Sequence, residues 1–254
     1  MTGFRPDHAM VLAAGLGVRM RPLTDDRPKP LIEVRERALI DHVLDRLAEA
    51  GVRRVVVNLH YRAEQLRQHL AGRGDVEILF SEEEMLLDSG GGVAKALPQL
   101  GEAPFFVCNA DSLWLNGALP ALDRLADEWD EARMDALLLL SPTVLSVGYE
   151  GLGDILMQPD GTIRFRRERE IAPFVFAGVQ IVHPRLLSGA GVEPFSIHRC
   201  WKTAQEGGRL FGLRHDGTWY HVGTPDALRE AEEHLAFELG HRHGERGLAG
   251  SHEA

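Results

Sequence analysis

Short apolar runs that suit buried strands alternate along this chain with patches whose apolar residues recur at helical spacing. The run RVVVNL at 54–59 reads as a strand, whereas the apolar residues at 39–47 repeat every three or four positions. Strands that alternate with helices favour a parallel sheet, because each crossover lays a helix on one face of it. We therefore expect an α/β fold, with a mostly parallel, mixed sheet sandwiched by helices.

The same two periods place the remaining elements and suggest one domain. Further strands are predicted at 10–14, 76–80, 105–108, 136–140, 154–158, 162–165 and 174–182, and further helices at 62–70 and 119–129. A chain of 254 residues is long enough to bury a sizeable core. We assign residues 1–239 to a single domain and expect the polar residues 240–254 to form a mobile tail.

Charge and composition exclude several classes of partner. The formal net charge of −10 argues against nucleic acid, whose phosphates attract basic surfaces. No stretch approaches the ~20 apolar residues of a membrane span, and the start MTGFRPDH lacks an apolar signal core. The two cysteines provide no disulfide framework. We expect a cytoplasmic protein with no membrane partner; its oligomeric state stays open.

A glycine-bearing loop follows the first predicted strand. Residues 12–31 read LAAGLGVRMRPLTDDRPKPL, so the strand leads directly into Gly15 and Gly17. Glycine can adopt positive φ and lets backbone N–H groups approach a phosphate chain closely. The loop is therefore a candidate phosphate site.

Positive charge follows the glycines at close spacing. Arg19, Arg21 and Lys29 supply the cations that a phosphate chain requires. Pro28 and Pro30 restrict the backbone on both sides of Lys29, which holds its ammonium in place. In an acidic chain, this local concentration of cations predicts a polyanionic ligand.

Two other phosphate-binding loops do not fit the spacing. A dinucleotide fingerprint requires a third glycine where Met20 stands, and no Gly-Lys-Ser/Thr follows four spacer residues as in a P-loop. The segment instead resembles the opening motif of the sugar-1-phosphate nucleotidyltransferases, LAAGxGTRxxPLT followed by PKPL, with Val18 replacing the threonine. The resemblance implies a Rossmann-like nucleotidyltransferase fold of the GT-A-like type.

The resemblance also implies where the nucleotide binds. The segment LDSGGGVAKAL resembles the family element that lines the nucleobase pocket, and its glycines would open a helix whose N–H groups are free. A tight turn without a ligand is the alternative for these glycines. The residues that we assign to the nucleotide are Ala13, Ala14, Gly15, Gly17, Ser89, Gly90 and Asn109.

Asp111 is the candidate metal ligand. It lies just past the predicted strand at 105–108, where a carboxylate suits Mg²⁺ bridging to a phosphate, although aspartate also caps helices. The family carries a second aspartate in WxDVGT, but this chain has His221, and imidazole suits zinc, manganese or iron better. We expect Mg²⁺, with Mn²⁺ as the alternative. His221 is a doubtful second ligand: water and phosphate oxygens could replace it, or catalysis could be impaired.

The sugar is expected at the strand FAGVQIV. The resemblance implies that Ala177 and Gly178 are small because a pyranose packs on them, while a bulge is the other reading of a glycine in a strand. Asp154 is preferred over Glu168 and Glu170 as an acceptor for sugar hydroxyls.

The implied reaction joins a nucleoside triphosphate to a sugar 1-phosphate, giving an NDP-sugar and pyrophosphate. Arg19 would stabilise the β- and γ-phosphates, and Lys29 the α-phosphate and the incoming phosphate. The chain looks most similar to the N-acetylmuramate 1-phosphate uridylyltransferases of peptidoglycan recycling, which implies UTP and N-acetylmuramic acid 1-phosphate as substrates. Mannose-1-phosphate guanylyltransferases and glucose-1-phosphate thymidylyltransferases use nearly the same motifs. A sensor of nucleotides or sugar phosphates that lost turnover is the non-enzyme alternative.

Overall fold

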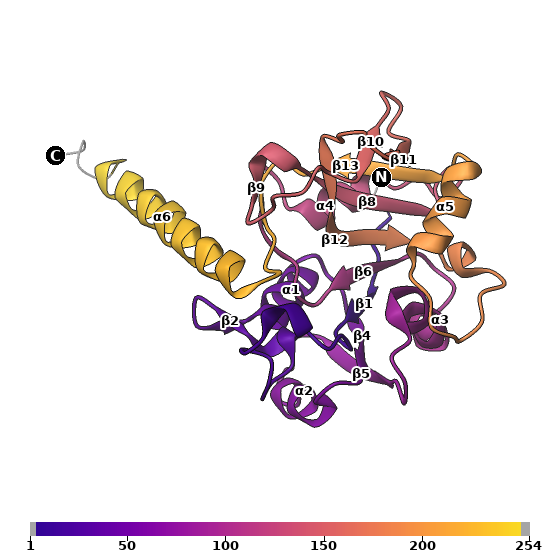
Figure 1. The fold of residues 1–254 in the computed structure, drawn as a ribbon, viewed down its shortest axis with the longest axis horizontal. Coiled ribbons are helices and arrows are strands. Elements are labelled where there is room, and N and C mark those ends of the chain that lie inside the picture. The colour runs from indigo at the N-terminus through magenta and orange to yellow at the C-terminus, as the bar shows by residue number, and fades with distance from the viewer. Residues whose placement is uncertain (1–3, 250–254) are drawn as a thin grey trace.

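A nine-stranded mixed sheet forms the centre of the molecule (Figure 1). The computed structural model describes the backbone of residues 4–249 and the side chains of residues 4–238. The central strands follow the spatial order β5 (Glu77–Glu82), β4 (Arg54–Leu59), β1 (His8–Leu12), β6 (Phe105–Asn109), β12 (Phe174–Val182), β8 (Ala136–Pro142) and β13 (Leu210–Arg214). β10 (Ile155–Met157) and β11 (Ile163–Phe165) extend the sheet from the start of β12.

The strand directions confirm a mixed sheet. β5, β4, β1 and β6 run parallel, as the alternation with helices predicts, and β13 runs parallel to β8. β12 is antiparallel to both β6 and β8, so the direction of the chain reverses next to β6. The ends of β1 and β6 and the middle of β12 thus meet at one edge, where ligands bind in sheets of this kind.

Helices cover both faces of this sheet and bury two apolar clusters. α1 (Leu39–Glu49), α2 (Ala63–Leu70) and α4 (Ala121–Glu128) cover one face. α3 (Asp88–Leu100), α5 (His198–Glu206) and the short 3₁₀ helix η4 (Pro184–Leu187) cover the other. Side chains alternate between the two faces along each strand, so Val11 joins the first cluster and Met10 the second.

A smaller third cluster joins the last helix to the loops at the ligand edge. The three-stranded sheet β7 (Leu113–Leu115), β14 (Thr218–Tyr220) and β9 (Ser146–Val147) lies beside the main sheet. α6 (Pro225–Ala249) packs its first turns here through Ala231 and Leu235, then projects from the body (Figure 1). A hairpin of β2 (Glu33–Val34) and β3 (Arg37–Ala38) completes the fold.

The structure corrects two details of the sequence-based prediction and adds a third. Residues 240–249, part of the expected mobile tail, continue α6 in their backbone, and residues 250–254 lie outside the described residues, so the mobility of the tail stays a prediction. The helix expected from Leu119 begins at Ala121, since Pro120 takes an extended conformation in front of it and Leu119 is exposed. The three glycines at 90–92 lie inside α3 rather than in a loop before it.

Candidate active site

In the glycine loop after β1, other parts of the protein pack on Gly17 but leave Gly15 accessible. Gly17 has a φ of 63°, and a Cβ there would lie 3.0 Å from Thr24 and 3.1 Å from Lys29. Gly15 has no protein atom within 4 Å of the position of a Cβ. The loop is anchored at Ala13, whose amide donates a hydrogen bond of 2.6 Å to the side-chain oxygen of Asn58. Gly15 therefore offers the surface that a ligand can approach closely.

Lys29 and Asp111 form an ion pair across 82 residues of sequence. Lys29 begins the 3₁₀ helix η2 (Lys29–Leu31), with Pro28 extended before it and Pro30 within it. Its side chain is 13% exposed, and that of Asp111, in the turn after β6, is 35% exposed. The structure thus brings the predicted phosphate-binding cation and the predicted metal ligand together at the edge of the sheet.

Arg19 and His221 belong to the same charged region. Arg19 lies in the 3₁₀ helix η1 (Val18–Met20), is exposed, and forms no ion pair with any residue between 4 and 238. Arg21 instead turns to Asp25, at 3.4 Å. Burial lowers the pKa of His221, and the nearby charges of Lys29 and Arg19 lower it further, while Asp111 opposes them. The imidazole is therefore neutral at pH 7.

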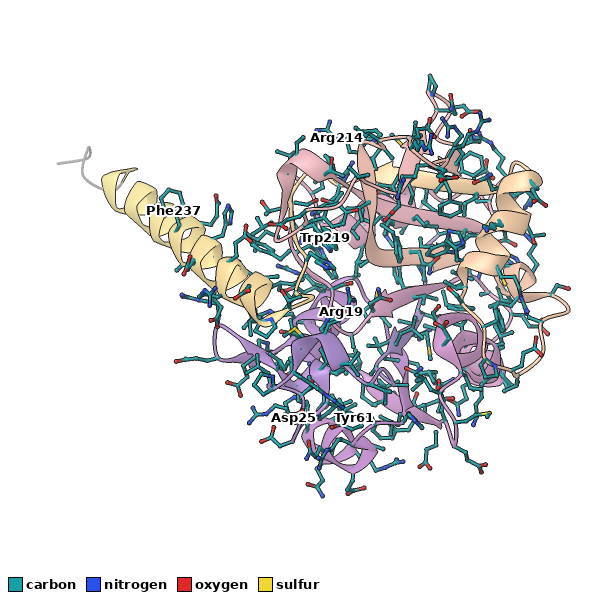
Figure 2. The ribbon with its side chains drawn as sticks, in the orientation of Figure 1. Arg19, Asp25, Tyr61, Arg214, Trp219 and Phe237 are labelled. Atoms are coloured by element: carbon teal, nitrogen blue, oxygen red, sulfur yellow. The ribbon has the colours of Figure 1, made fainter. Side chains whose placement is uncertain are left out.

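The ring of His221 is fixed by its aromatic neighbours. It lies 5.6 Å from Trp219 and edge-on to Tyr149 at 5.9 Å, and Figure 2 shows Trp219 in the same part of the molecule as Arg19. A Cβ on Gly223 would stand 2.5 Å from Nε2 of His221, so the ring lies against the backbone there. This packing fixes the ring within the positively charged region.

The side chains at this edge fit Mg²⁺ bound by one carboxylate. Among the described residues, no three His, Cys, Asp or Glu side chains gather as a metal site. Mg²⁺ is commonly held by one or two carboxylates plus substrate phosphates and water, and Asp111 suits that arrangement. His221 lies close to the positive charges of Lys29 and Arg19, which would repel a metal ion bound to its imidazole, so it is a poor metal ligand.

A pocket of 320 Å³ opens beside the glycine loop, and we call it the nucleotide pocket. Four of the predicted nucleotide residues line it, namely Ala14, Gly15, Ser89 and Asn109. Its other lining residues are Leu12, Asn58, Glu83, Leu86 and Asp88. Four of the seven residues assigned to the nucleotide thus line one pocket although they are far apart in sequence, whereas Ala13, Gly17 and Gly90 do not line it.

Sequence analysis missed Asn58 and Glu83, which are buried polar residues in this pocket. Asn58 donates to Oε1 of Glu83 at 2.7 Å, and Oε2 of Glu83 accepts from the amide of Leu87 at 2.9 Å. The two side chains thereby connect β4 to the start of α3. An asparagine at the end of the apolar run RVVVNL was the available signal.

Gly90 and Gly91 are small because the protein packs on them. A Cβ on Gly90 would lie 2.2 Å from the ring of Phe195, and one on Gly91 would lie 2.1 Å from the carbonyl oxygen of Glu193. Both amides donate to the carbonyl of Phe195, at 2.9 and 3.2 Å. These two N–H groups are not free for an acceptor, contrary to the expectation from the sequence.

Gly178 likewise fits against protein atoms. Its φ is 79°, and a Cβ would lie 2.0 Å from Oγ of Ser112 and 3.1 Å from the side-chain nitrogen Nδ2 of Asn109. Ser112 also donates to the carbonyl of Ala177 at 3.1 Å. The register of β12 against β8 shifts between Phe176 and 180, so the glycine marks a bulge, the alternative reading of the sequence.

Of the three acidic candidates for the sugar, Asp154 and Glu168 line one pocket, and Asp154 and Glu170 differ clearly in their partners. Asp154 is 55% exposed in its side chain and lies 4.0 Å from Arg166, at the mouth of a further pocket. Glu170 forms a fork with Arg164 at 2.6 and 2.7 Å, which lowers the pKa of its carboxyl to about 2. Glu170 thus has a close structural partner, whereas Asp154 is largely exposed and has only a distant one.

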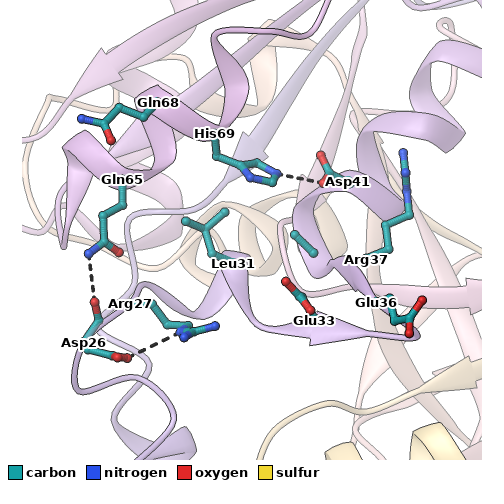
Figure 3. A pocket seen from close by; sticks show the side chains of 11 residues that line it. Asp26, Arg27, Leu31, Glu33, Glu36, Arg37, Asp41, Gln65, Gln68 and His69 are labelled. Carbon is teal, nitrogen blue, oxygen red and sulfur yellow. Dashed lines mark hydrogen bonds and ion pairs between the residues drawn. The ribbon is translucent and has the colours of Figure 1, made fainter.

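A hollow of 740 Å³ lies on the outer side of η2 and is lined in part by Leu31 (Figure 3). Some of its polar groups pair with one another: Asp41 with His69 at 2.8 Å, and the Asp26 carbonyl with the side-chain amide of Gln65 at 2.9 Å. No predicted site residue lines it.

Comparison with known proteins identifies the family. Residues 9–145 match the MobA-like NTP transferase domain. The chain is 47% identical to an N-acetylmuramate α-1-phosphate uridylyltransferase of Caulobacter vibrioides over 91% of this chain and 98% of that protein. It is 34% identical to a protein of the same name from Neisseria meningitidis, over 88% and 96%.

The fold also matches a solved structure. A UDP-glucose pyrophosphorylase complexed with UDP-glucose superposes with a TM-score of 0.74 at 17% identity, over 91% of this chain and 99% of that one. Within residues 4–249, no helix is long and apolar enough to cross a membrane. The chain therefore belongs to the MobA-like NTP transferase family and, within it, to the sugar-1-phosphate nucleotidyltransferases.

Proposed function

We propose that this protein transfers the uridylyl group of UTP to N-acetylmuramate α-1-phosphate, releasing pyrophosphate and forming UDP-N-acetylmuramate. The names of two relatives, at 47% and 34% identity over most of their length, support this choice of substrates. The observation that carries the proposal is the meeting of Lys29 and Asp111 beside the glycine loop. A cytoplasmic location stays a prediction from the sequence.

The reaction requires charge stabilisation more than proton transfer. An oxygen of the sugar 1-phosphate forms a bond to the α-phosphorus, and the bond from that phosphorus to the oxygen bridging it to the β-phosphate breaks. Since the monoester is already an anion, no general base is needed. Lys29 binds the α-phosphate and the incoming phosphate, and Arg19, free of ion pairs among the described residues, binds the β- and γ-phosphates.

Asp111 is the residue that would hold Mg²⁺, with phosphate oxygens and water as the other ligands. The ion would neutralise charge on the triphosphate and so favour loss of pyrophosphate. Lys29 must exchange Asp111 for phosphate when substrate binds, because an ammonium held by a carboxylate contributes little charge to the substrate.

We assign the base to the nucleotide pocket and the sugar to the surface beside β12. Ser89 and Asn109 line the nucleotide pocket and carry side chains able to hydrogen-bond a base. Ala177 is buried with its carbonyl bonded to Ser112, and Ser112 and Asn109 occupy the space beside Gly178, so these residues fix the course of β12 beside the nucleotide pocket, where we propose that the sugar lies.

The experiment is a matrix of pyrophosphate release. UTP, GTP, dTTP and CTP are each combined with the 1-phosphates of N-acetylmuramate, N-acetylglucosamine, mannose and glucose, with Mg²⁺ or Mn²⁺. We expect the highest kcat/KM for UTP with N-acetylmuramate 1-phosphate. A higher value for GTP with mannose 1-phosphate, or for dTTP with glucose 1-phosphate, would replace the proposal. Binding of these ligands without release of pyrophosphate would identify a sensor.

A further inference from the structure

A second pocket, of 660 Å³, adjoins the sugar strand. Its apolar wall includes Phe176 on β12 and Trp201 on α5, which meet edge-on at 5.0 Å. Phe176 precedes Gly178 by two positions, and Gly178 lies against Asn109 of the nucleotide pocket. We call this space the cationic pocket.

A second connection joins the two pockets through the start of α5. The amide of Ile197 donates to Oγ of Ser89 at 3.0 Å, so the segment that leads into α5 rests on the nucleotide pocket. His198, the next residue, lines the cationic pocket. The two pockets are thus connected structurally, through β12 and through the start of α5.

The lining of this pocket is positively charged in an acidic protein. Three cations, Arg166, Arg167 and Lys202, face two carboxylates, Asp154 and Glu168, which gives a net charge of +1 against −10 for the whole chain. Lys202 has no carboxylate within ion-pair distance among residues 4–238. Lys202 on α5 can therefore pair with an anionic ligand, and Arg166, just after β11, has Asp154 as a carboxylate partner only at 4.0 Å.

The hairpin that carries Arg166 is held in place by Glu170. The Glu170 carboxylate forms the fork with Arg164 and accepts from the amide of Arg167 at 2.9 Å. The Glu170 carbonyl accepts from Nη1 of Arg166 at 3.3 Å. The side chain of Arg166 is 33% exposed, so its guanidinium is positioned and still reachable by a ligand.

Burial and the charge of Lys202 lower the pKa of His198, whose ring lies 4.1 Å from that of Phe165. The imidazole is thus neutral at pH 7 and adds a hydrogen-bonding edge to an otherwise aromatic wall. This surface suits a group with a polar end and an apolar body.

We propose that the cationic pocket binds the lactyl carboxylate of the sugar substrate, with Arg166 and Lys202 as its ion-pair partners. The inference rests on the proposed function. N-acetylmuramate differs from N-acetylglucosamine by a lactyl ether on C3, which adds one carboxylate and one methyl group. Cations facing an aromatic wall are the complement of such a group. These residues select the sugar and take no part in the transfer itself.

The test compares Arg166→Gln and Lys202→Gln, singly and together, with the unchanged protein. We measure kcat/KM for the 1-phosphates of N-acetylmuramate and N-acetylglucosamine with UTP. Loss of one charge-assisted hydrogen bond predicts a fall of about 10-fold to 100-fold for the carboxylate-bearing sugar in each variant. The value for N-acetylglucosamine 1-phosphate and the KM for UTP should change by less than about 2-fold, since these interactions are untouched.

Arg199→Gln is the matched control. Arg199 lies on the same helix as Lys202, so this variant also removes one positive charge, but Arg199 pairs with Glu193 at 3.3 Å and does not line the pocket. The preference of this variant for the lactyl sugar should equal that of the unchanged protein. Arg166→Lys should restore part of the lost preference, because the positive charge is retained.

The outcomes separate the two proposals. If the unchanged protein shows no preference for the lactyl sugar, the proposed function fails and this inference with it. If the preference exists and survives the double variant, the inference alone is overturned. An equal loss on both sugars also overturns it, because the two cations would then act on the shared phosphate or on the fold.

Discussion

Replacing Lys29 with methionine removes one charge and keeps most of the side-chain volume. In the structure, the Lys29 ammonium binds Asp111 and stands at the carboxyl edge of the sheet, where the α-phosphate is proposed to lie. Methionine cannot make either contact. The change therefore isolates the contribution of a single positioned cation.

The expected fall in kcat follows from the proposed role of Lys29, and the expected loss of stability follows from the burial of the Lys29–Asp111 pair. Loss of one preorganised donor to a developing charge costs about 2.7–4 kcal/mol, so kcat should fall by about 100-fold or more. The stability cost should be small. Because the Asp111 side chain is 35% exposed and can be hydrated, we expect about 1 kcal/mol, or roughly 2–4 °C in Tm.

The assay is pyrophosphate release at saturating substrates, with Tm measured on the same samples. Arg53→Met is the matched control, because Arg53 lies outside the predicted site, is 80% exposed and forms an ion pair with Asp7. Its kcat should stay within about 2-fold of the unchanged value. If Lys29→Met retains near-full turnover, or if its loss of activity only follows a large fall in Tm, the reasoning is refuted.

Four further substitutions test the packing of the site and of a buried histidine outside it. Gly178→Ala should cost about 2 kcal/mol or more in unfolding free energy by urea titration, since its φ is 79° and Oγ of Ser112 would lie 2.0 Å from the new Cβ. Gly15→Ala meets nothing within 4 Å, so its Tm should hold while turnover falls; equal Tm losses in both variants would contradict this contrast. Asn58→Ala removes the hydrogen-bond partner of the Ala13 amide and of Oε1 of the buried Glu83 carboxylate, so it should lower the unfolding free energy by about 1–3 kcal/mol and raise the KM for UTP. An unchanged Tm would show that these hydrogen bonds contribute nothing to stability. Burial lowers the pKa of His215 from its usual 6.5, so the unfolded chain binds a proton that the folded chain resists, and stability should fall as pH drops below 6.5. His215→Gln should flatten that part of the urea-derived pH profile, and an unaltered slope would remove His215 as its source.

The amino-acid sequence by itself determined several strands and helices and the local shape of the glycine loop. The strands expected at 54–59 and 174–182 have those bounds in the structure, because apolar periodicity is a property of a few neighbouring residues. The motif at 12–31 likewise predicts a phosphate site at Gly15 and Lys29, since its glycines and prolines act on the local backbone.

Only the tertiary structure decided which distant residues meet. The order of β1, β6 and β12 brings Lys29 to Asp111, and parallel pairing of β4 with β5 sets Asn58 beside Glu83. The same packing reveals why position 178 is glycine: a serine and an asparagine from the end of β6 fill the space. A sequence pattern encodes the spacing of neighbours along the chain, but these contacts depend on sheet order and on a bulge, which no local spacing specifies.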